Sequence, residues 1–245
     1  MGTVLIPADG LSLAGRWYPG DENNKKAVIF SHGLFSTKDG YKITRLAEFI
    51  TDAGFSLLTF DFRYAGESGE DISEISVLRE VEDLAAVVSY VRDQGFEEVH
   101  LMGSSMGAAV TLLYCGRGGR ADSLITIAAP VDLLSILPRM DREAARSLPE
   151  EGYTDIDGIK LCNSFFRELA AIDIENLLGA ITAPLLAIHG ARDTVVPPAQ
   201  GEVLQARYGG KLRFVTVDDG DHNLTREEDI ELLKGEVISW LRGAG

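Results

Sequence analysis

The sequence contains little cysteine and histidine. Of its 245 residues, two are cysteine and four are histidine. Cys115 and Cys162 stand in dissimilar surroundings, far from any cluster of His and Cys residues with the spacing of metal ligands. A disulfide-stabilised scaffold and a zinc module are therefore excluded, and we expect each cysteine to be a buried thiol.

Positive charge is also scarce. The chain has 23 Lys and Arg residues against 38 Asp and Glu residues, which gives a formal net charge of −15. A protein of this charge repels DNA, RNA and anionic lipid surfaces. The acidic residues are spread along the chain, as on a solvated surface. We expect no nucleic-acid partner and no membrane partner.

Long apolar runs are missing as well. No run approaches the length that spans a bilayer, and residues 1–7 lack the basic start, apolar stretch and cleavage site of a secretory signal. These absences predict a cytoplasmic location. The hydrophobic content of 45% is nevertheless sufficient for a sizeable core.

Short apolar runs alternate with segments of helical periodicity. The runs typical of buried strands are 27–30, 55–60, 99–102, 124–128, 185–188 and 212–217. Apolar residues recur every three to four positions in 41–53, 77–94, 105–115, 198–208 and 226–242. Two earlier segments, 3–6 and 11–18, flank a turn sequence and predict a hairpin. The whole pattern predicts an α/β fold with a mostly parallel eight-stranded sheet and helices on both faces.

One connection is longer than a crossover helix requires. About fifty residues separate two predicted core strands between Val131 and Thr182. We therefore expect a core formed by 1–130 and 183–245 and a small cap inserted at 131–182, after the sixth strand. Apolar side chains of this insertion, together with one in an earlier loop, are expected to line a substrate pocket: Phe35, Leu137, Phe165 and Phe166.

Residues 103–107 read Gly-Ser-Ser-Met-Gly, a G-x-S-x-G motif that follows a predicted strand and precedes a predicted helix. In this context the central serine occupies a strained turn, and the glycines let strand and helix approach closely. The register makes Ser105 the candidate nucleophile and Ser104 a small spacer. The motif alone is moderately specific, because a tight turn with an idle serine also satisfies it.

A serine hydroxyl needs a base to accept its proton. Among the four histidines, His100 lies inside a predicted strand, and His32 and His189 begin loops at strand ends, where a supporting hydrogen bond is expected. His222 differs because it lies in the loop between the last strand and the last helix. We choose His222 as the base.

The base in turn needs an acid. Asp193 follows the strand at 185–188 and precedes His222, in the order serine, acid, histidine. Asp132, after the preceding strand, is the rival candidate. Three aspartates nearer to the histidine are interpreted as turn formers: Asp218, Asp219 and Asp221. We choose Asp193.

The oxyanion of the reaction intermediate needs preorganised donors. The backbone N–H of Met106, directly after the candidate nucleophile, is one candidate. The loop that follows the strand at 27–30 reads Ser-His-Gly-Leu-Phe, and it makes the N–H of Leu34 the second candidate.

Together, these motifs resemble the α/β-hydrolase superfamily. The resemblance rests on segments 31–35, 61–68 and 103–107 and on the segments around Asp193 and His222, and it spans nearly the whole chain. The compact size and the insertion resemble bacterial cinnamoyl and feruloyl esterases, with monoacylglycerol lipases and serine aminopeptidases as neighbours. The resemblance implies a Ser105, Asp193 and His222 triad. One departure is the sequence Arg-Tyr-Ala-Gly at 63–66, where many relatives have Arg-Gly-His-Gly.

The sequence therefore predicts a serine hydrolase that cleaves small-molecule esters of short-chain or aromatic acids through an acyl-enzyme, without a cofactor or metal. One alternative is an aminopeptidase or amidase, in which acidic residues of the insertion hold the substrate amine: Asp141, Glu143, Glu150 or Glu151. Another is a non-catalytic binding protein of the same fold. A homodimer is left open.

Overall fold

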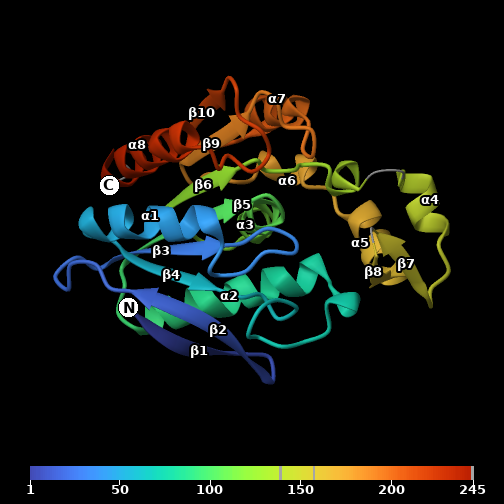
Figure 1. Ribbon diagram of the computed structural model, residues 1–245, viewed down its shortest axis with the longest axis horizontal. Helices are drawn as coiled ribbons and strands as arrows, with labels where there is room; N and C mark the ends of the chain where they lie inside the picture. The colour runs from blue at the N-terminus through green and yellow to red at the C-terminus, as the bar shows by residue number, and fades with distance from the viewer. Residues whose placement is uncertain (138–139, 157, 244–245) are drawn as a thin grey trace.

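The computed structural model of the protein describes residues 1–137, 140–156 and 158–243. An eight-stranded sheet crosses the molecule, in the spatial order β1-β2-β4-β3-β5-β6-β9-β10 (Figure 1). Its strands are β1 (Gly2–Ala8), β2 (Leu11–Tyr18), β3 (Lys26–Ser31), β4 (Ser56–Phe60), β5 (Glu98–Ser104), β6 (Ser123–Ile127), β9 (Leu185–Gly190) and β10 (Leu212–Val217). The predicted eight-stranded sheet is confirmed.

The first two strands form the antiparallel part of the sheet. β1 pairs with β2, and β2 pairs with β4, in antiparallel register, whereas the pairs from β4 to β10 are parallel. The hairpin turn uses Asp9 and Gly10, both at positive φ. β4 and β6 are buried at every position, which explains their continuous apolar sequences.

Helices cover both faces of the sheet and create two cores. α1 (Tyr41–Asp52) and α8 (Glu227–Gly243) pack on one face, whereas α2 (Val77–Asp93) and α3 (Met106–Gly116) pack on the other. α7 (Pro198–Arg207) also contributes to the core on the α2 and α3 face. Side chains alternate between the faces, so that Val28 of β3 points toward α1 and Ile29 points toward α2 and α3. α2 begins with Ser76, whose hydroxyl accepts the N–H of Arg79.

The connection between β6 and β9 carries several short elements. They are η2 (Leu133–Ile136), α4 (Arg142–Ser147), β7 (Tyr153–Ile156), β8 (Ile159–Cys162), α5 (Asn163–Ala171) and α6 (Glu175–Leu178). β7 and β8 form a separate antiparallel pair. Figure 1 shows α4, α5, β7 and β8 beyond the carboxyl ends of the parallel strands, at the right of the view. The division into a core and a cap stays a prediction.

Within the described ranges, no helix combines the length and the apolar character that crossing a membrane requires.

Candidate active site

Ser105 occupies the sharp turn between β5 and α3. Its φ of 53° and ψ of −121° place a non-glycine residue in a strained conformation. The flanking glycines make the turn sterically feasible, since a Cβ at Gly107 would lie 2.2 Å from the carbonyl oxygen of Ser31. A Cβ at Gly103 would lie 2.4 Å from the carbonyl oxygen of Gly107. This close packing fixes Ser105 at the carboxyl edge of the sheet.

Two further loops bring their side chains to Ser105. His222, in the loop between β10 and α8, places Nε2 3.0 Å from the hydroxyl oxygen of Ser105. Its Nδ1 lies 2.8 Å from Oδ2 of Asp193, which follows β9. A neutral imidazole that donates from Nδ1 to the carboxylate leaves Nε2 free to accept the serine proton. The structure thus places the three predicted residues in one hydrogen-bonded chain.

Asp193 is held as a carboxylate. Burial pushes its pKa upward, but the hydrogen bonds from His222 and from the backbone N–H of Val196 outweigh this and keep the pKa of Asp193 below its usual value. Its other carboxylate oxygen, Oδ1, accepts the N–H groups of Val195 and Val196 at 2.9 and 2.8 Å. The fixed negative charge can orient the imidazole and stabilise its protonated form.

The alternative candidates have other hydrogen-bond partners than Ser105. Nδ1 of His100 lies 2.9 Å from the hydroxyl oxygen of Ser123, and Nε2 of His189 lies 2.9 Å from the carbonyl oxygen of Val196. Asp132 accepts a hydrogen bond from Arg142 at 2.8 Å and caps η2.

His32 supports the loop that holds Leu34. Its Nε2 accepts the backbone N–H of Phe62 at 3.2 Å, and its Nδ1 lies 2.9 Å from the carbonyl oxygen of Gly33. Burial lowers the pKa of His32, which favours the neutral ring that this pattern requires. His32 therefore ties two loops together beside Ser105.

The predicted oxyanion donors lie on the two segments that meet here. A Cβ at Gly33 would lie 3.2 Å from Cβ of Ser105, so the loop backbone runs directly against the turn. Leu34 follows Gly33, and Met106 follows Ser105. Neither backbone N–H has an acceptor among the residues that the structure describes, so both are available to a ligand.

Buried ion pairs hold the neighbouring segments. Asp61, after β4, accepts the backbone N–H and the ammonium group of Lys38 at 2.7 and 2.8 Å. Arg63 binds Asp83 of α2 through two nitrogens at 3.0 and 2.6 Å, and both side chains are almost fully buried. Removing one partner of such a pair would leave an uncompensated buried charge. These pairs fix the loops that flank the Leu34 segment.

A cavity of about 260 Å³ opens at the nucleophile. It is lined by Ser105 and His222, by Leu34 of the oxyanion loop, and by Lys42 and Asn223. We call it the Ser105 cavity. The predicted pocket residues Phe35, Leu137, Phe165 and Phe166 are not among its described lining residues.

The aromatic residues of α5 point in another direction. Phe165 and Phe166 are almost fully buried, because the apolar face of α5 packs into the core that contains α2. Leu137 is also buried in that core. Phe35 is 51% exposed and lines a neighbouring cavity of about 270 Å³, which it shares with Leu34. A contact between these four residues and substrate stays a prediction. Leu137, Phe165 and Phe166 are buried in the core, whereas Phe35 is accessible.

The sequence patterns did not single out Lys42. Its ammonium nitrogen lies 3.1 Å from the hydroxyl oxygen of Ser104, directly before the candidate nucleophile. Desolvation lowers the pKa of Lys42 to about 8, although Asp221, Asp193 and Asp229 pull in the opposite direction. No motif contains this residue, because its place in the site arises only when α1 packs beside the end of β5.

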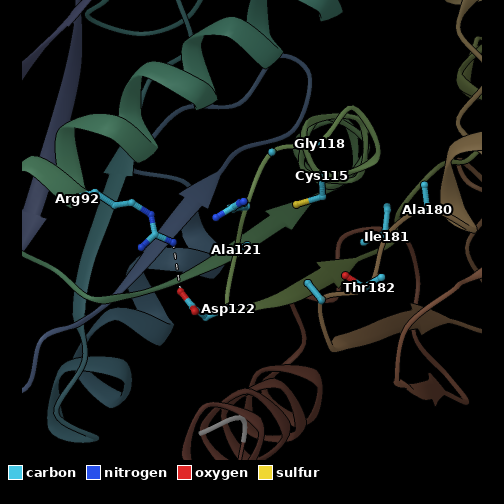
Figure 2. Close-up of a pocket in the computed structure, with 11 residues that line it drawn as sticks. Arg92, Cys115, Gly118, Ala121, Asp122, Ala180, Ile181 and Thr182 are labelled. Carbon is cyan, nitrogen blue, oxygen red and sulfur yellow. Dashed lines mark hydrogen bonds and ion pairs between the residues drawn. The ribbon is translucent and has the colours of Figure 1, made fainter.

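A larger hollow lies at the opposite end of the sheet. It measures about 740 Å³, and Figure 2 shows Arg92, Cys115 and Asp122 around it. Arg92 and Asp122 pair with each other at 3.3 Å. Burial raises the pKa of Cys115 to about 12, so this thiol stays protonated. The described residues that line this hollow therefore include neither an activated nucleophile nor a histidine that could serve as its base.

The sequence of residues 22–150, just over half of the chain, matches the family described as serine aminopeptidase, S33. The chain belongs to this family of hydrolases. It is 26% identical over 219 residues to the uncharacterized protein YfhR of Escherichia coli K12, covering 87% of this chain and 70% of that protein. It is 27% identical over 221 residues to the mitochondrial palmitoyl-protein thioesterase ABHD10 of Rattus norvegicus, covering 84% of this chain and 72% of the relative.

Solved structures share the fold. Est1E from Butyrivibrio proteoclasticus with bound ferulic acid superposes with a TM-score of 0.83 at 22% identity, covering 98% of both chains. The mouse alpha/beta hydrolase domain-containing protein 10 superposes with a TM-score of 0.81 at 22% identity, covering 100% of both chains. The predicted α/β-hydrolase fold and superfamily are thereby confirmed, and this family member is a hydrolase.

Proposed function

We propose that this hydrolase is a serine carboxylesterase that cleaves small esters of short-chain or aromatic acids through an acyl-enzyme. The observation that carries the proposal is the hydrogen-bonded chain from Ser105 through His222 to Asp193, with distances of 3.0 and 2.8 Å, at a strained turn. In this arrangement a base can accept the proton of the serine, and an acid orients the base.

In the first step, the hydroxyl oxygen of Ser105 attacks the ester carbonyl carbon while Nε2 of His222 takes the hydroxyl proton. Asp193 stabilises the imidazolium that forms. The carbonyl π electrons move onto oxygen, and the N–H groups of Leu34 and Met106 receive the resulting oxyanion. One such donor typically lowers the barrier by about 3 kcal/mol.

In the second step, the carbon–oxygen bond to the alcohol breaks, and His222 returns the proton to the leaving oxygen. Water then attacks the acyl-enzyme, with His222 again accepting a proton, and the acid leaves as Ser105 regains its hydrogen. Each bond change is served by the same side chains, so the cycle requires no cofactor.

The names of similar proteins support acyl transfer. One relative is a palmitoyl-protein thioesterase, and one structural neighbour holds ferulic acid, an aromatic acid. A thioesterase acts on an acyl carbonyl, and ferulic acid carries one. The overlap supports an ester substrate for this chain and is the reason to include an aromatic ester in the test.

The family description gives specific support to a second candidate, an aminopeptidase or amidase. The four acidic residues that could hold a substrate amine lie on α4 and just around it: Asp141, Glu143, Glu150 and Glu151. They are not among the described residues that line the Ser105 cavity. This placement favours the ester over the amide.

A fluorophosphonate probe tests whether the serine is activated. We expect the wild-type protein to be labelled at Ser105, Ser105→Ala to be unlabelled, and the neighbouring Ser104→Ala variant to remain labelled. A panel of p-nitrophenyl esters from acetate to decanoate, methyl ferulate and an amino-acid anilide then defines the reaction. Labelling that persists in Ser105→Ala would contradict the assignment, and faster cleavage of the anilide than of every ester would favour the second candidate.

A further inference from the structure

We propose that Lys42 makes this enzyme prefer esters whose alcohol part carries an anionic group, such as a carboxylate. The inference rests on the proposed esterase function and deepens it by defining the leaving group. It stands on the position of Lys42 in the Ser105 cavity, on the partners of the surrounding charges, and on the direction in which the alcohol must depart.

Lys42 lies where a bound substrate reacts. It is the second residue of α1, and its side chain lines the cavity that also contains Ser105 and His222. Its ammonium group donates to the hydroxyl oxygen of Ser104, which precedes Ser105 in the turn. A positive charge is therefore held one residue from the nucleophile.

This ammonium group lacks an acidic partner within the part of the chain that the structure describes. No carboxylate oxygen of those residues lies within 4.0 Å of it, whereas Lys26, Lys38 and Lys234 each have one at 2.9 Å or less. Desolvation without a close counter-ion is the main reason that its pKa falls to about 8. An anionic substrate would supply the missing counter-ion.

The acidic residues that attract Lys42 from a distance already have partners. Asp193 binds His222 at 2.8 Å, and Asp229 binds Arg226 at 2.6 Å. Asp221 accepts the backbone N–H groups of its own turn, including that of Asn223 at 2.9 Å. In a chain of net charge −15, Lys42 is thus a cation that can offset the repulsion of an anion at the nucleophile.

The direction of proton transfer places the alcohol on the Lys42 side. His222 must return its proton to the leaving oxygen, so the alcohol leaves next to His222 and Asn223, which share the cavity with Lys42. The neighbouring cavity, with Phe35 and Tyr64, is lined by neither Ser105 nor His222 among the described residues, so it is not the space next to the proton donor.

The start of α1 adds to the positive potential. Gly40 and Tyr41 line the Ser105 cavity, and α1 has no side-chain cap and no acidic residue in its first turn. Backbone N–H groups at a helix start favour negative charge. This contribution supports the ammonium group of Lys42 and would not specify an anion by itself.

Two acetate esters that differ by one charge test the inference. The substrates are 4-(carboxymethyl)phenyl acetate and its neutral analogue 4-(carbamoylmethyl)phenyl acetate. In the first, the phenyl ring and a methylene group separate the carboxylate from the reacting oxygen. We expect wild-type kcat/KM to favour the carboxylate about tenfold, the scale of one hydrogen bond to a charged group. In Lys42→Met the ratio should fall to about one, and in Lys42→Arg a preference should remain.

Lys25→Met is the matched control for overall charge. Lys25 is exposed and precedes β3, at the end of the sheet away from Ser105. This variant loses the same single charge as Lys42→Met. We expect its substrate ratio to equal that of the wild type, so a fall in both variants would mean that net charge, and not Lys42, sets the preference and would overturn the inference.

The pH dependence supplies a readout that a structural role would not move. Wild-type preference for the carboxylate should decline as pH rises through about 8, because Lys42 loses its proton while Asp221, Asp193 and Asp229 oppose that loss. In Lys42→Arg the preference should persist across the same range, since arginine stays protonated. The pH dependence of kcat/KM reports pKa values of the free enzyme, which is the state in which Lys42 has these neighbours.

The outcomes separate this inference from the proposed function. A ratio near one in the wild type, or an unchanged ratio in Lys42→Met, overturns the role of Lys42 while turnover of the neutral ester leaves the esterase proposal standing. Turnover of neither ester, with no fluorophosphonate labelling of Ser105, overturns the esterase proposal itself. If Lys42→Met does not fold, the Lys42→Arg pH profile decides the question.

Discussion

The two ends of the parallel sheet differ in the size of their cavities and in the side chains that line them. The larger cavity is not the one that contains the candidate catalytic residues. At the amino end, the hollow in Figure 2 measures about 740 Å³ and contains a paired Arg92 and Asp122 and a protonated thiol. At the carboxyl end, the Ser105 cavity measures about 260 Å³. The smaller space is lined by the serine, by the imidazole of His222 and by Lys42. We therefore place the proposed reaction where these side chains converge and not in the larger cavity.

Chain direction explains the difference. The loops after β3, β5, β9 and β10 all leave the sheet at its carboxyl end, and they supply Leu34, Ser105, Asp193 and His222. Parallel strands bring these loops together from distant parts of the sequence. At the amino end, Arg92 and Asp122 pair with each other at 3.3 Å, and the described residues that line the hollow include no serine and no histidine.

The largest expected effect is the loss of the nucleophile. Ser105→Ala should lower kcat/KM for p-nitrophenyl acetate by about 10⁶-fold, because no acyl-enzyme can form. Its melting temperature, measured by circular dichroism, should stay close to that of the wild type. A folded variant that retains full activity would show that the carboxyl end does not act through this serine.

A smaller effect is expected at the acid. Asp193→Asn should reduce kcat/KM by about 10⁴-fold, since an amide cannot stabilise the imidazolium and favours the wrong tautomer of His222. The depressed pKa of Asp193 also stabilises the folded wild type above the unfolded pKa, and this contribution disappears as pH falls through the folded pKa. The difference in melting temperature between wild type and Asp193→Asn should therefore be smaller at pH 3 than at pH 7. An activity within tenfold of wild type would contradict the role of Asp193.

The sequence predicted most of the sheet because its strands are buried on both faces. β4 and β6 have no exposed position, so their apolar character is continuous and easily recognised. β7 and β8 are short, and Tyr153 and Asp155 of β7 are exposed. The sequence Gly-Tyr-Thr-Asp at 152–155 is therefore typical of a turn, although 153–156 form a strand.

The sequence located the candidate triad residues more readily than the cavity around them. Ser105 stands in a local motif, and His222 was selected because the other histidines lie in strands or at strand ends. Lys42 has no such signal, because its contact with Ser104 spans 62 positions of the chain. Composition likewise indicated that the insertion is apolar, but not that Phe165 and Phe166 would point into the core.

Glu80 provides a third test, beside the site but outside its hydrogen-bonded chain. Its side chain is 4% exposed, and its Oε2 has no partner among the described residues. Burial, with Asp83 and Glu168 nearby, raises the pKa of Glu80 well above its usual value. The folded state therefore holds this proton more tightly than the unfolded state, and stability falls as pH rises from the unfolded toward the folded pKa.

Glu80→Gln should remove that penalty. We expect the variant to exceed the wild type by about 1 kcal/mol in the free energy of unfolding at pH 8, with the difference shrinking toward pH 5. Urea unfolding at the two pH values measures it. A variant that is less stable at pH 8 would show that the ionised carboxylate makes a stabilising interaction.

The smallest effect is expected at the amino end, where Arg92→Ala removes a charge from the larger hollow. The Arg92 and Asp122 side chains are 38% and 39% exposed, so their pair contributes about 1 kcal/mol or less to stability. Ester hydrolysis should stay within about twofold of wild type, because Arg92 lies at the opposite end of the sheet from the serine. A tenfold loss of kcat/KM in a stably folded Arg92→Ala protein would mean that the amino end of the sheet affects the reaction at Ser105. The contrast between the two ends would then be wrong.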